Sequence, residues 1–156
     1  MNEKLYLFNP YNIKKVDSKE IEKLYKEVMN GLLEEPNTMY EYAHNIEVYS
    51  NLNYLNGEVI ARLTEDLINL KTEIEIGKAT KSVDERKNWN VERDGKQPAM
   101  VYFEALGTKF CEKEIKLLAR KECSLKRFKT AYSSIEEKIN ALKKKMDSIK
   151  YEEFNE

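Results

Sequence analysis

Near the C-terminal end, the chain repeats apolar residues at a strictly alternating spacing of three and four. Ten positions follow this spacing, and nine of them are apolar: Leu118, Lys121, Leu125, Phe128, Tyr132, Ile135, Ile139, Leu142, Met146 and Ile149. Because an α-helix turns once in 3.6 residues, this spacing places all ten side chains on one face. The pattern predicts a helix over about residues 99–149 that must bury this face against a partner.

A second long helix is predicted upstream. Thr38, with Glu41 three residues later, is typical of a capping box at a helix start. The predicted helix continues to about residues 83–86, with an apolar line from Tyr42 to Ile74 that is interrupted at Asn56-Gly57. We expect one helix across this interruption, since an internal glycine costs only about 1 kcal/mol. Between the two helices, residues 87–98 lose the periodicity and contain Asp94-Gly95 and Pro98, which predicts a turn.

The composition agrees with long, solvent-exposed helices. The 156 residues include only 5 Gly and 3 Pro, while charged residues reach 35%. We predict an all-α fold: a short N-terminal helix over residues 21–33 and a long antiparallel coiled-coil-like helical hairpin that oligomerises. The predicted domains are an extended aromatic arm (residues 1–16), a single helical-hairpin domain (17–150) and an acidic tail (151–156).

We expect no membrane-spanning segment, because no apolar run approaches 18 residues, and no signal peptide, because the apolar stretch near the start, Leu5–Phe8, is too short. Cys111 and Cys123 would lie about 18 Å apart on one helix, too far for a disulfide. We therefore expect a reduced, cytoplasmic protein with no membrane partner.

Enzyme motifs are missing from the sequence. There is no glycine-rich phosphate loop, and the single histidine, His44, gives neither a metal site nor a triad. Most carboxylates sit among lysines at helical spacing, as on a solvated face. The prediction is a protein that is not an enzyme, with no catalytic residues, no cofactor and no metal.

Charge is unevenly distributed along the chain. Residues 41–70 hold five acidic residues and one basic one, whereas residues 109–150 hold thirteen basic and six acidic ones. The acidic helix can face the basic one across the hairpin, but a basic surplus remains. A possible second basic face contains Arg120, Lys121, Lys126, Arg127 and Lys129. The predicted oligomer or core seam contains Leu63, Leu67, Leu70, Ile74, Leu118, Leu125, Phe128, Tyr132, Ile135, Ile139, Leu142 and Met146.

Cations also gather around Trp89 at the predicted turn. Cations bind phosphates and an exposed aromatic ring can stack on an unpaired base, so this combination suits single-stranded nucleic acid. Four nearby acids dilute the charge, and Trp89 could equally cap the end of the coiled coil. The candidate DNA-binding residues are Lys71, Lys78, Lys81, Arg86, Lys87, Trp89, Arg93 and Lys96.

The start of the first long helix resembles a known family. Its sequence is Tyr40-Glu41-Tyr42-Ala43-His44-Asn45-Ile46-Glu47-Val48-Tyr49-Ser50. It is similar to the Tyr-Glu-x-Ala-x-Asn-(apolar)-x-(apolar)-Tyr-Ser opening of the tailed-phage recombination mediator proteins of the UvsY type. The run Leu125-Lys-Arg-Phe-Lys-Thr-Ala-Tyr-Ser-Ser-Ile135 is also similar, and the resemblance extends over about residues 18–150.

This resemblance implies a homo-oligomer, closed into a ring, that binds single-stranded DNA. It implies that the protein helps to load a RecA-like recombinase onto strands covered by single-strand-binding protein, in a bacterial host cell if phage-encoded. Lys71, Lys78 and Lys81 match the family's DNA-contacting positions. The alternative from the residues alone is a phage or bacterial coiled-coil adaptor or inhibitor that acts only through protein contacts.

Overall fold

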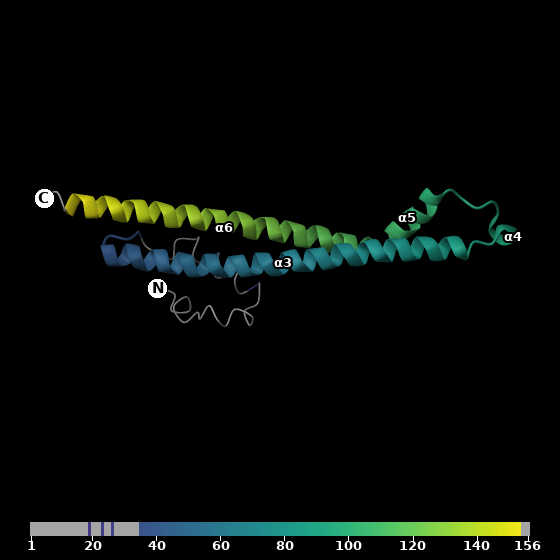
Figure 1. Cartoon of the computed structure of the whole chain (residues 1–156), viewed down its shortest axis with the longest axis horizontal. Coiled ribbons are helices and arrows are strands. Elements are labelled where there is room, and N and C mark those ends of the chain that lie inside the picture. Colours follow the sequence, from purple (N-terminus) through teal and green to yellow (C-terminus); the bar gives the residue numbers. More distant parts are fainter. Residues whose placement is uncertain (1–18, 20–22, 24–25, 27–34, 154–156) are drawn as a thin grey trace. The chain divides into compact units, whose positions relative to one another are not determined.

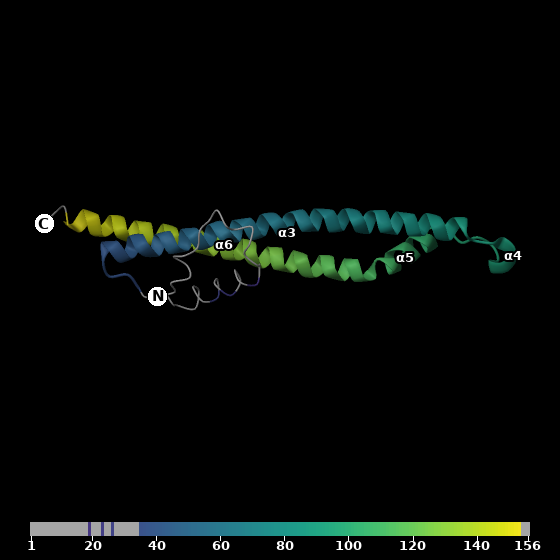
Figure 2. The same cartoon turned by 90° about the horizontal axis from the view of Figure 1, so that it is seen from below.

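The computed structural model describes residues 19, 23, 26 and 35–153, and these residues form four helices and no strand. The helices are α3 (Met39–Lys87), α4 (Val91–Asp94), α5 (Met100–Phe110) and α6 (Glu112–Glu153), shown in Figure 1 and Figure 2. The prediction of an all-α fold is confirmed. α3 continues through Asn56-Gly57, as expected, and ends one residue beyond the predicted range.

Several predicted segments lie outside the described residues. They are the arm over residues 1–16, most of the short helix over residues 21–33, and residues 154–156 of the tail. Lys23 and Lys26, which are described, have helical backbone and exposed side chains. The rest of the tail belongs to α6, which continues to Glu153.

The chain divides into two compact units, and α3 and α6 contribute to both. The first unit combines Met1–Ala61 with Lys126–Glu156, and the second unit is Arg62–Leu125. Each unit has an apolar cluster of its own. A single domain over residues 17–150, in the form of one long coiled-coil-like hairpin, stays a prediction.

In the first unit, α3 and α6 bury a shared apolar cluster. Its members are Tyr42, Val48, Tyr49 and Leu52 from α3, and Ile135, Ile139 and Leu142 from α6. Within this unit the helices run antiparallel: Tyr49 lines a pocket with Leu142, whereas the α-carbon of Gly57 faces Tyr132. Of the other predicted seam residues here, Met146 packs against the cluster, and Phe128 and Tyr132 are half-buried.

The capping box predicted at the start of α3 is confirmed. The backbone N–H groups of Asn37 and Thr38 donate to Glu41 Oε2 over 2.7 and 3.1 Å, and the N–H of Glu41 donates to Thr38 Oγ1 over 3.2 Å. The N–H of Tyr42 reaches the carbonyl of Thr38. The backbone N–H groups at the start of α3 therefore have hydrogen-bond acceptors, which the helix itself does not provide at its N-terminal end.

The capping box makes the stability of α3 depend on pH. Hydrogen bonds from Asn37, then Thr38, lower the pKa of Glu41 below its usual 4.5. The carboxylate therefore stabilises the fold above pH 4.5, and this contribution disappears as the pH falls through the lowered pKa. We expect Glu41→Gln to melt at a lower temperature than the wild type at neutral pH, and the difference to shrink in acid. Thermal melts of both proteins across this range check it; a difference independent of pH contradicts it.

The second unit has its own antiparallel pairing of helices. Leu70 and Ile74 of α3 are buried with Cys111, and Ile115 and Leu118 of α6 pack against them. Leu67 is also buried, while Leu63 and Leu125 are half-buried.

Lys121 explains the one charged position in the apolar alternation. Its ammonium group, on a half-buried side chain, forms an ion pair with Asp66 of α3. A second ion pair joins Lys71 to Glu122 over 2.9 Å. The Lys121–Asp66 pair has the predicted sense, an acidic residue of α3 with a basic residue of α6, whereas the Lys71–Glu122 pair has the opposite sense.

The prediction of one uninterrupted helix over residues 99–149 is wrong at Cys111. This residue separates α5 from α6, and its backbone has φ −92° and ψ 19°. On its N-terminal side, Gly107 lies so close to α3 that an added Cβ would be 2.5 Å from the carbonyl oxygen of Lys78. Cys111 itself is buried, with Sγ 3.8 Å from the carbonyl oxygen of Ile74. We attribute the break to these two close contacts, which hold the backbone against α3 at both points.

Candidate nucleic-acid interface

All eight candidate DNA-binding residues belong to the second unit. Five lie on α3, and Trp89, Arg93 and Lys96 follow in and around α4. Lys71 is 16 residues from Lys87, or about 24 Å along a helix. Lys71 is therefore remote from the turn, although Lys78 is only about 10 Å away along the helix, and the ammonium group of Lys71 is already paired with Glu122.

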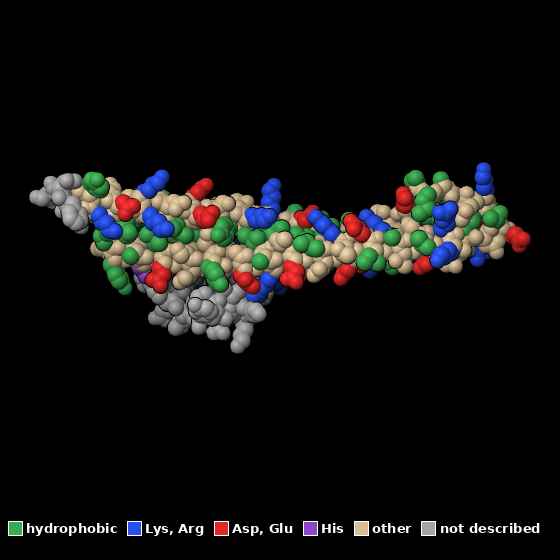
Figure 3. Space-filling view, viewed as in Figure 1, with side chains coloured by type: hydrophobic (Ala, Val, Ile, Leu, Met, Phe, Trp, Pro, Cys, Tyr) green, Lys and Arg blue, Asp and Glu red, His purple; other side chains and the backbone are tan. Residues whose placement is uncertain are grey.

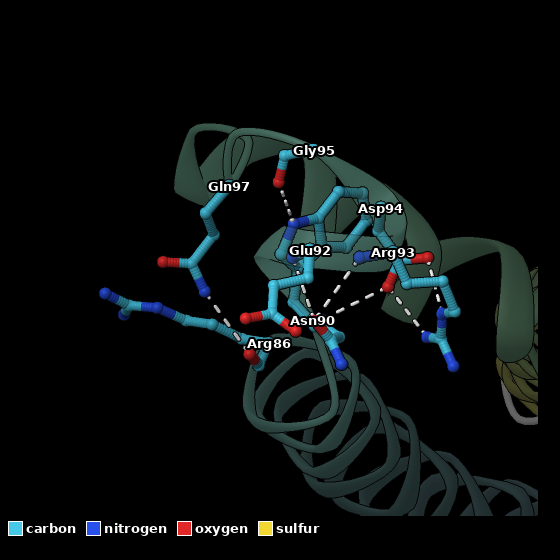
Figure 4. A network of polar contacts seen from close by, with 8 residues as sticks. Arg86, Asn90, Glu92, Arg93, Asp94, Gly95 and Gln97 are labelled. Atoms are coloured by element: carbon cyan, nitrogen blue, oxygen red, sulfur yellow. Dashed lines mark hydrogen bonds and ion pairs between the residues drawn. The ribbon is translucent and has the colours of Figure 1, made fainter.

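The predicted turn contains the short helix α4, which Asn90 caps (Figure 4). The side-chain oxygen of Asn90 accepts hydrogen bonds from the N–H groups of Glu92 and Arg93 over 2.9 and 3.3 Å. Gly95 ends the helix with φ 79°, a left-handed conformation that favours glycine. The side-chain amide of Gln97 then donates to the carbonyl of Arg86 over 3.3 Å. Local hydrogen bonds thus hold the turn in one shape.

Trp89 packs within the chain and is half-buried. Its indole N–H donates to the carbonyl of Gly95 over 3.0 Å. The ring meets Tyr102 and Phe103 edge to face, with ring centres 6.1 and 5.9 Å apart. These contacts match the alternative in which Trp89 closes the end of the helical pair. Phe103 lies completely buried beneath it, and its carbonyl accepts a hydrogen bond from Ser82.

Three of the candidate cations form ion pairs with carboxylates. Besides Lys71, Lys81 pairs with Glu85 over 2.7 Å and lies 5.6 Å from the ring centre of Phe110. Arg93 pairs with Asp94 over 2.7 Å. The hydrogen bond from Arg93, followed by that from the Asn90 backbone, lowers the pKa of Asp94. Asp94 in turn raises the pKa of Arg93.

The remaining candidate cations have no carboxylate partner among the described residues. Arg86 directs a guanidinium N–H toward the sulfur of Met100 over 3.8 Å. Lys78, Lys87 and Lys96 form no ion pair within the described part of the chain; Lys78 is half-buried, and the other two are exposed. Among the eight candidates, free positive charge therefore comes from these four residues, and exposed Lys109 of α5 adds to it.

Sequence reasoning missed the apolar surface of α5. Val101, Tyr102 and Phe110 are 71%, 46% and 63% exposed. Figure 3 shows hydrophobic and basic side chains next to one another over the α4 and α5 region. The signal was present in Met100-Val101-Tyr102-Phe103, a run that is apolar on all sides of a helix. We call the exposed side chains of Arg86, Lys87, Lys96, Val101, Tyr102 and Phe110 the tip surface.

The possible second basic face is divided between the units. Arg120 and Lys121 lie in the second unit, and Lys121 is paired with Asp66. The first unit holds Lys126, Arg127 and Lys129, which are exposed and without an ion pair among the described residues.

The described residues contain no group of three His, Cys, Asp or Glu side chains placed to hold a metal ion. His44 is buried, and its ring is stacked on that of Tyr40 at a centre distance of 6.4 Å. Both cysteines are free thiols, with Cys111 buried and Cys123 exposed. Within this part of the chain, no helix has an apolar stretch that could traverse a bilayer.

Comparison with protein-family models, curated proteins and solved structures finds no match. The similarity to recombination mediators therefore rests on the residues of α3 and α6 quoted above, and the family of this chain is not shown by any relative.

Proposed function

We propose that this protein is a non-catalytic recombination mediator that binds single-stranded DNA through the tip surface. The observation that carries the proposal is the exposure of Tyr102 in the same α4–α5 region as cations without a carboxylate partner: the guanidinium of Arg86 lies 3.8 Å from the sulfur of Met100, two residues before Tyr102. Lys87 and Lys96 are exposed without a carboxylate partner in the described chain, and Tyr102 is nearly half exposed. Phosphates attract the cations, and an unpaired base can stack on the phenol ring.

The proposal assigns Tyr102 the stacking role first considered for Trp89. The indole N–H and the ring of Trp89 already have partners within the chain, and its contact with Tyr102 helps to hold that ring in place. A base-stacking ring is most effective when it is held in position before the strand arrives, because less side-chain freedom is lost on binding.

One tip surface offers few cations, so one copy binds weakly. Several copies on one strand would bind far more tightly, because each contact raises the effective concentration of the next. In this proposal a homo-oligomer, closed into a ring, displaces single-strand-binding protein and helps to load a RecA-like recombinase. Mediation then requires only that the protein binds the strand covered by single-strand-binding protein and the strand loaded with recombinase with different affinities. It requires no covalent chemistry.

A second candidate function is an adaptor or inhibitor that acts through protein contacts alone. The exposed apolar side chains of α5 favour it, because exposed apolar patches commonly mark sites where proteins bind. The two candidates differ in the ligand that covers Tyr102 and Phe110, and nucleic-acid binding separates them.

The deciding experiment measures binding of a labelled oligothymidine across a salt series. For the wild type, affinity should fall steeply as salt rises, because bound cations release counterions from the strand. In Lys87→Glu with Lys96→Glu, the salt slope should decrease by about 1.4, since each phosphate contact contributes about 0.7 for single strands. Affinity at low salt should fall at least about tenfold.

A matched control carries the same change of charge on the first unit. Lys126→Glu with Arg127→Glu should leave affinity within about twofold if the tip surface is the site. If this control loses affinity and the tip variant does not, the DNA path follows α6. If the intact wild-type protein does not bind at low salt, the mediator proposal is rejected and the protein-contact function replaces it.

A further inference from the structure

The side of α3 that faces away from the core of the second unit carries its own apolar stripe. Ile68, Thr72, Ile76, Ala79 and Val83 follow one another at spacings of four, four, three and four residues. This spacing places them on one helix face, roughly half a turn from the buried Leu70 and Ile74. Ile68 and Ile76 are each 61% exposed. The hydroxyl of Thr72 donates a hydrogen bond to the backbone carbonyl of Ile68 over 3.0 Å. We call these five residues the α3 outer face.

Acidic residues border the α3 outer face. Glu65, Glu73 and Glu75 are exposed on α3, and none forms an ion pair within the described chain. Two exposed isoleucines beside unpaired carboxylates form a surface that favours an apolar and basic partner.

The opposite side of the second unit offers a surface of this kind. Lys113, Lys116, Leu117 and Arg120 point away from the packed side chains of Ile115 and Leu118, and all four are exposed. Lys116 pairs with Glu112, whereas Lys113 and Arg120 have no ion pair in the described chain. Leu117 is 45% exposed. We call these four residues the α6 outer face.

We propose that the α3 outer face of one copy binds the α6 outer face of the next. Unpaired carboxylates would meet unpaired cations, and Ile68 and Ile76 would be covered together with Leu117. The contact joins two different surfaces, so a bound pair still has one free surface of each kind, one on each copy. Such a head-to-tail contact generates a ring when the rotation closes and a filament when it does not.

This inference deepens the proposed function, which requires many copies of the tip surface on one strand. The two remain separable, because assembly is measured without nucleic acid. An assembly that binds no DNA would leave the interface intact and reject the mediator, whereas a DNA-binding monomer would reject the interface.

Two charge variants test the contact by light scattering of the full chain. Variant A is Glu73→Lys with Glu75→Lys, and variant B is Lys113→Glu with Arg120→Glu. In each variant alone, like charges face each other across the contact. For both variants we expect the protein concentration at which half of the chains are assembled to rise at least about tenfold. A change of this size corresponds to the loss of one ion pair of modest strength.

Mixing the variants is the sharper measurement. The basic α3 outer face of A matches the acidic α6 outer face of B, and the unchanged faces match as well. An equimolar mixture should therefore assemble at close to the wild-type concentration, in alternating order. Glu136→Lys with Glu137→Lys, exposed sites in the first unit and outside both faces, is the control with the same charge change as A and should assemble normally.

Three results would overturn the proposal: a wild-type protein that stays monomeric at all concentrations, variants that assemble like the wild type, or a mixture that does not recover. Circular dichroism of A and B establishes that both keep their helices, so that lost assembly is not lost folding. Ile68→Glu with Ile76→Glu should also prevent assembly, and mixing with B should yield no more than pairs: the unchanged α3 outer face of B can still bind the unchanged α6 outer face of the isoleucine variant, but every further contact lacks the isoleucines or places like charges together.

Discussion

Ile135→Asp should be the most damaging single substitution in the first unit. The side chain of Ile135 is completely buried in the cluster that α3 and α6 share. An aspartate at this position would be buried without a partner or would have to be protonated, and either outcome opposes folding. We expect a loss of about 3–5 kcal/mol in the free energy of unfolding, measured by urea denaturation followed by circular dichroism.

The control for Ile135→Asp places the same carboxylate two residues earlier. Ser133 is on α6 and exposed, so Ser133→Asp should change stability by less than about 0.5 kcal/mol. If Ile135→Asp unfolds at the urea concentration of the control, residue 135 does not face the core, and the helix phase of α6 described here is wrong.

Gly107→Ala should weaken the second unit, although alanine favours helices. An added Cβ would lie 2.5 Å from the carbonyl oxygen of Lys78 and 3.0 Å from Ser82 Oγ. The first atom belongs to the backbone of α3, so α5 must move away from α3 to make room. Such overpacking commonly costs about 1–3 kcal/mol and outweighs the gain of at most about 1 kcal/mol in helix propensity. Denaturation in urea measures the difference.

Gly57→Ala provides the opposite result within the same chain. Gly57 is also inside a helix, but an added Cβ would lie 3.6 Å from a side-chain carbon of Tyr132, an ordinary contact. We expect this variant to gain up to about 1 kcal/mol. The interpretation of Gly107 as a site of close helix approach is wrong if both alanine variants are stabilised alike.

The periodic parts of the sequence predict the structure best. The capping box of Thr38 and Glu41 and the continuous helix through Gly57 follow from local hydrogen bonding and helix propensity, which act over a few residues. The alternation near the C-terminal end indicates correctly that Ile135, Ile139 and Leu142 are buried, because one face of a helix repeats regularly along its sequence.

The break at Cys111 could not be predicted in this way. It depends on the distance between Gly107 and Lys78, which lie 29 residues apart in the sequence. Of the three paired cations, only Lys71 depends on a similar long-range contact, since its carboxylate is on α6, whereas Lys81 and Arg93 pair with residues four and one positions away. Likewise, only the packing around Trp89 indicates that Tyr102 is the more exposed ring.

The pairing of Lys121 with Asp66 also limits how α3 and α6 can align in the second unit. If α6 slid along α3 by one helical turn, the ammonium group of Lys121 would lie next to Leu63 or Leu70 and not next to the carboxylate of Asp66. Apolar residues alone tolerate such sliding, because one leucine can replace another in the same groove. A charged residue inside an apolar row does not, so this lysine selects a single register among several with similar packing.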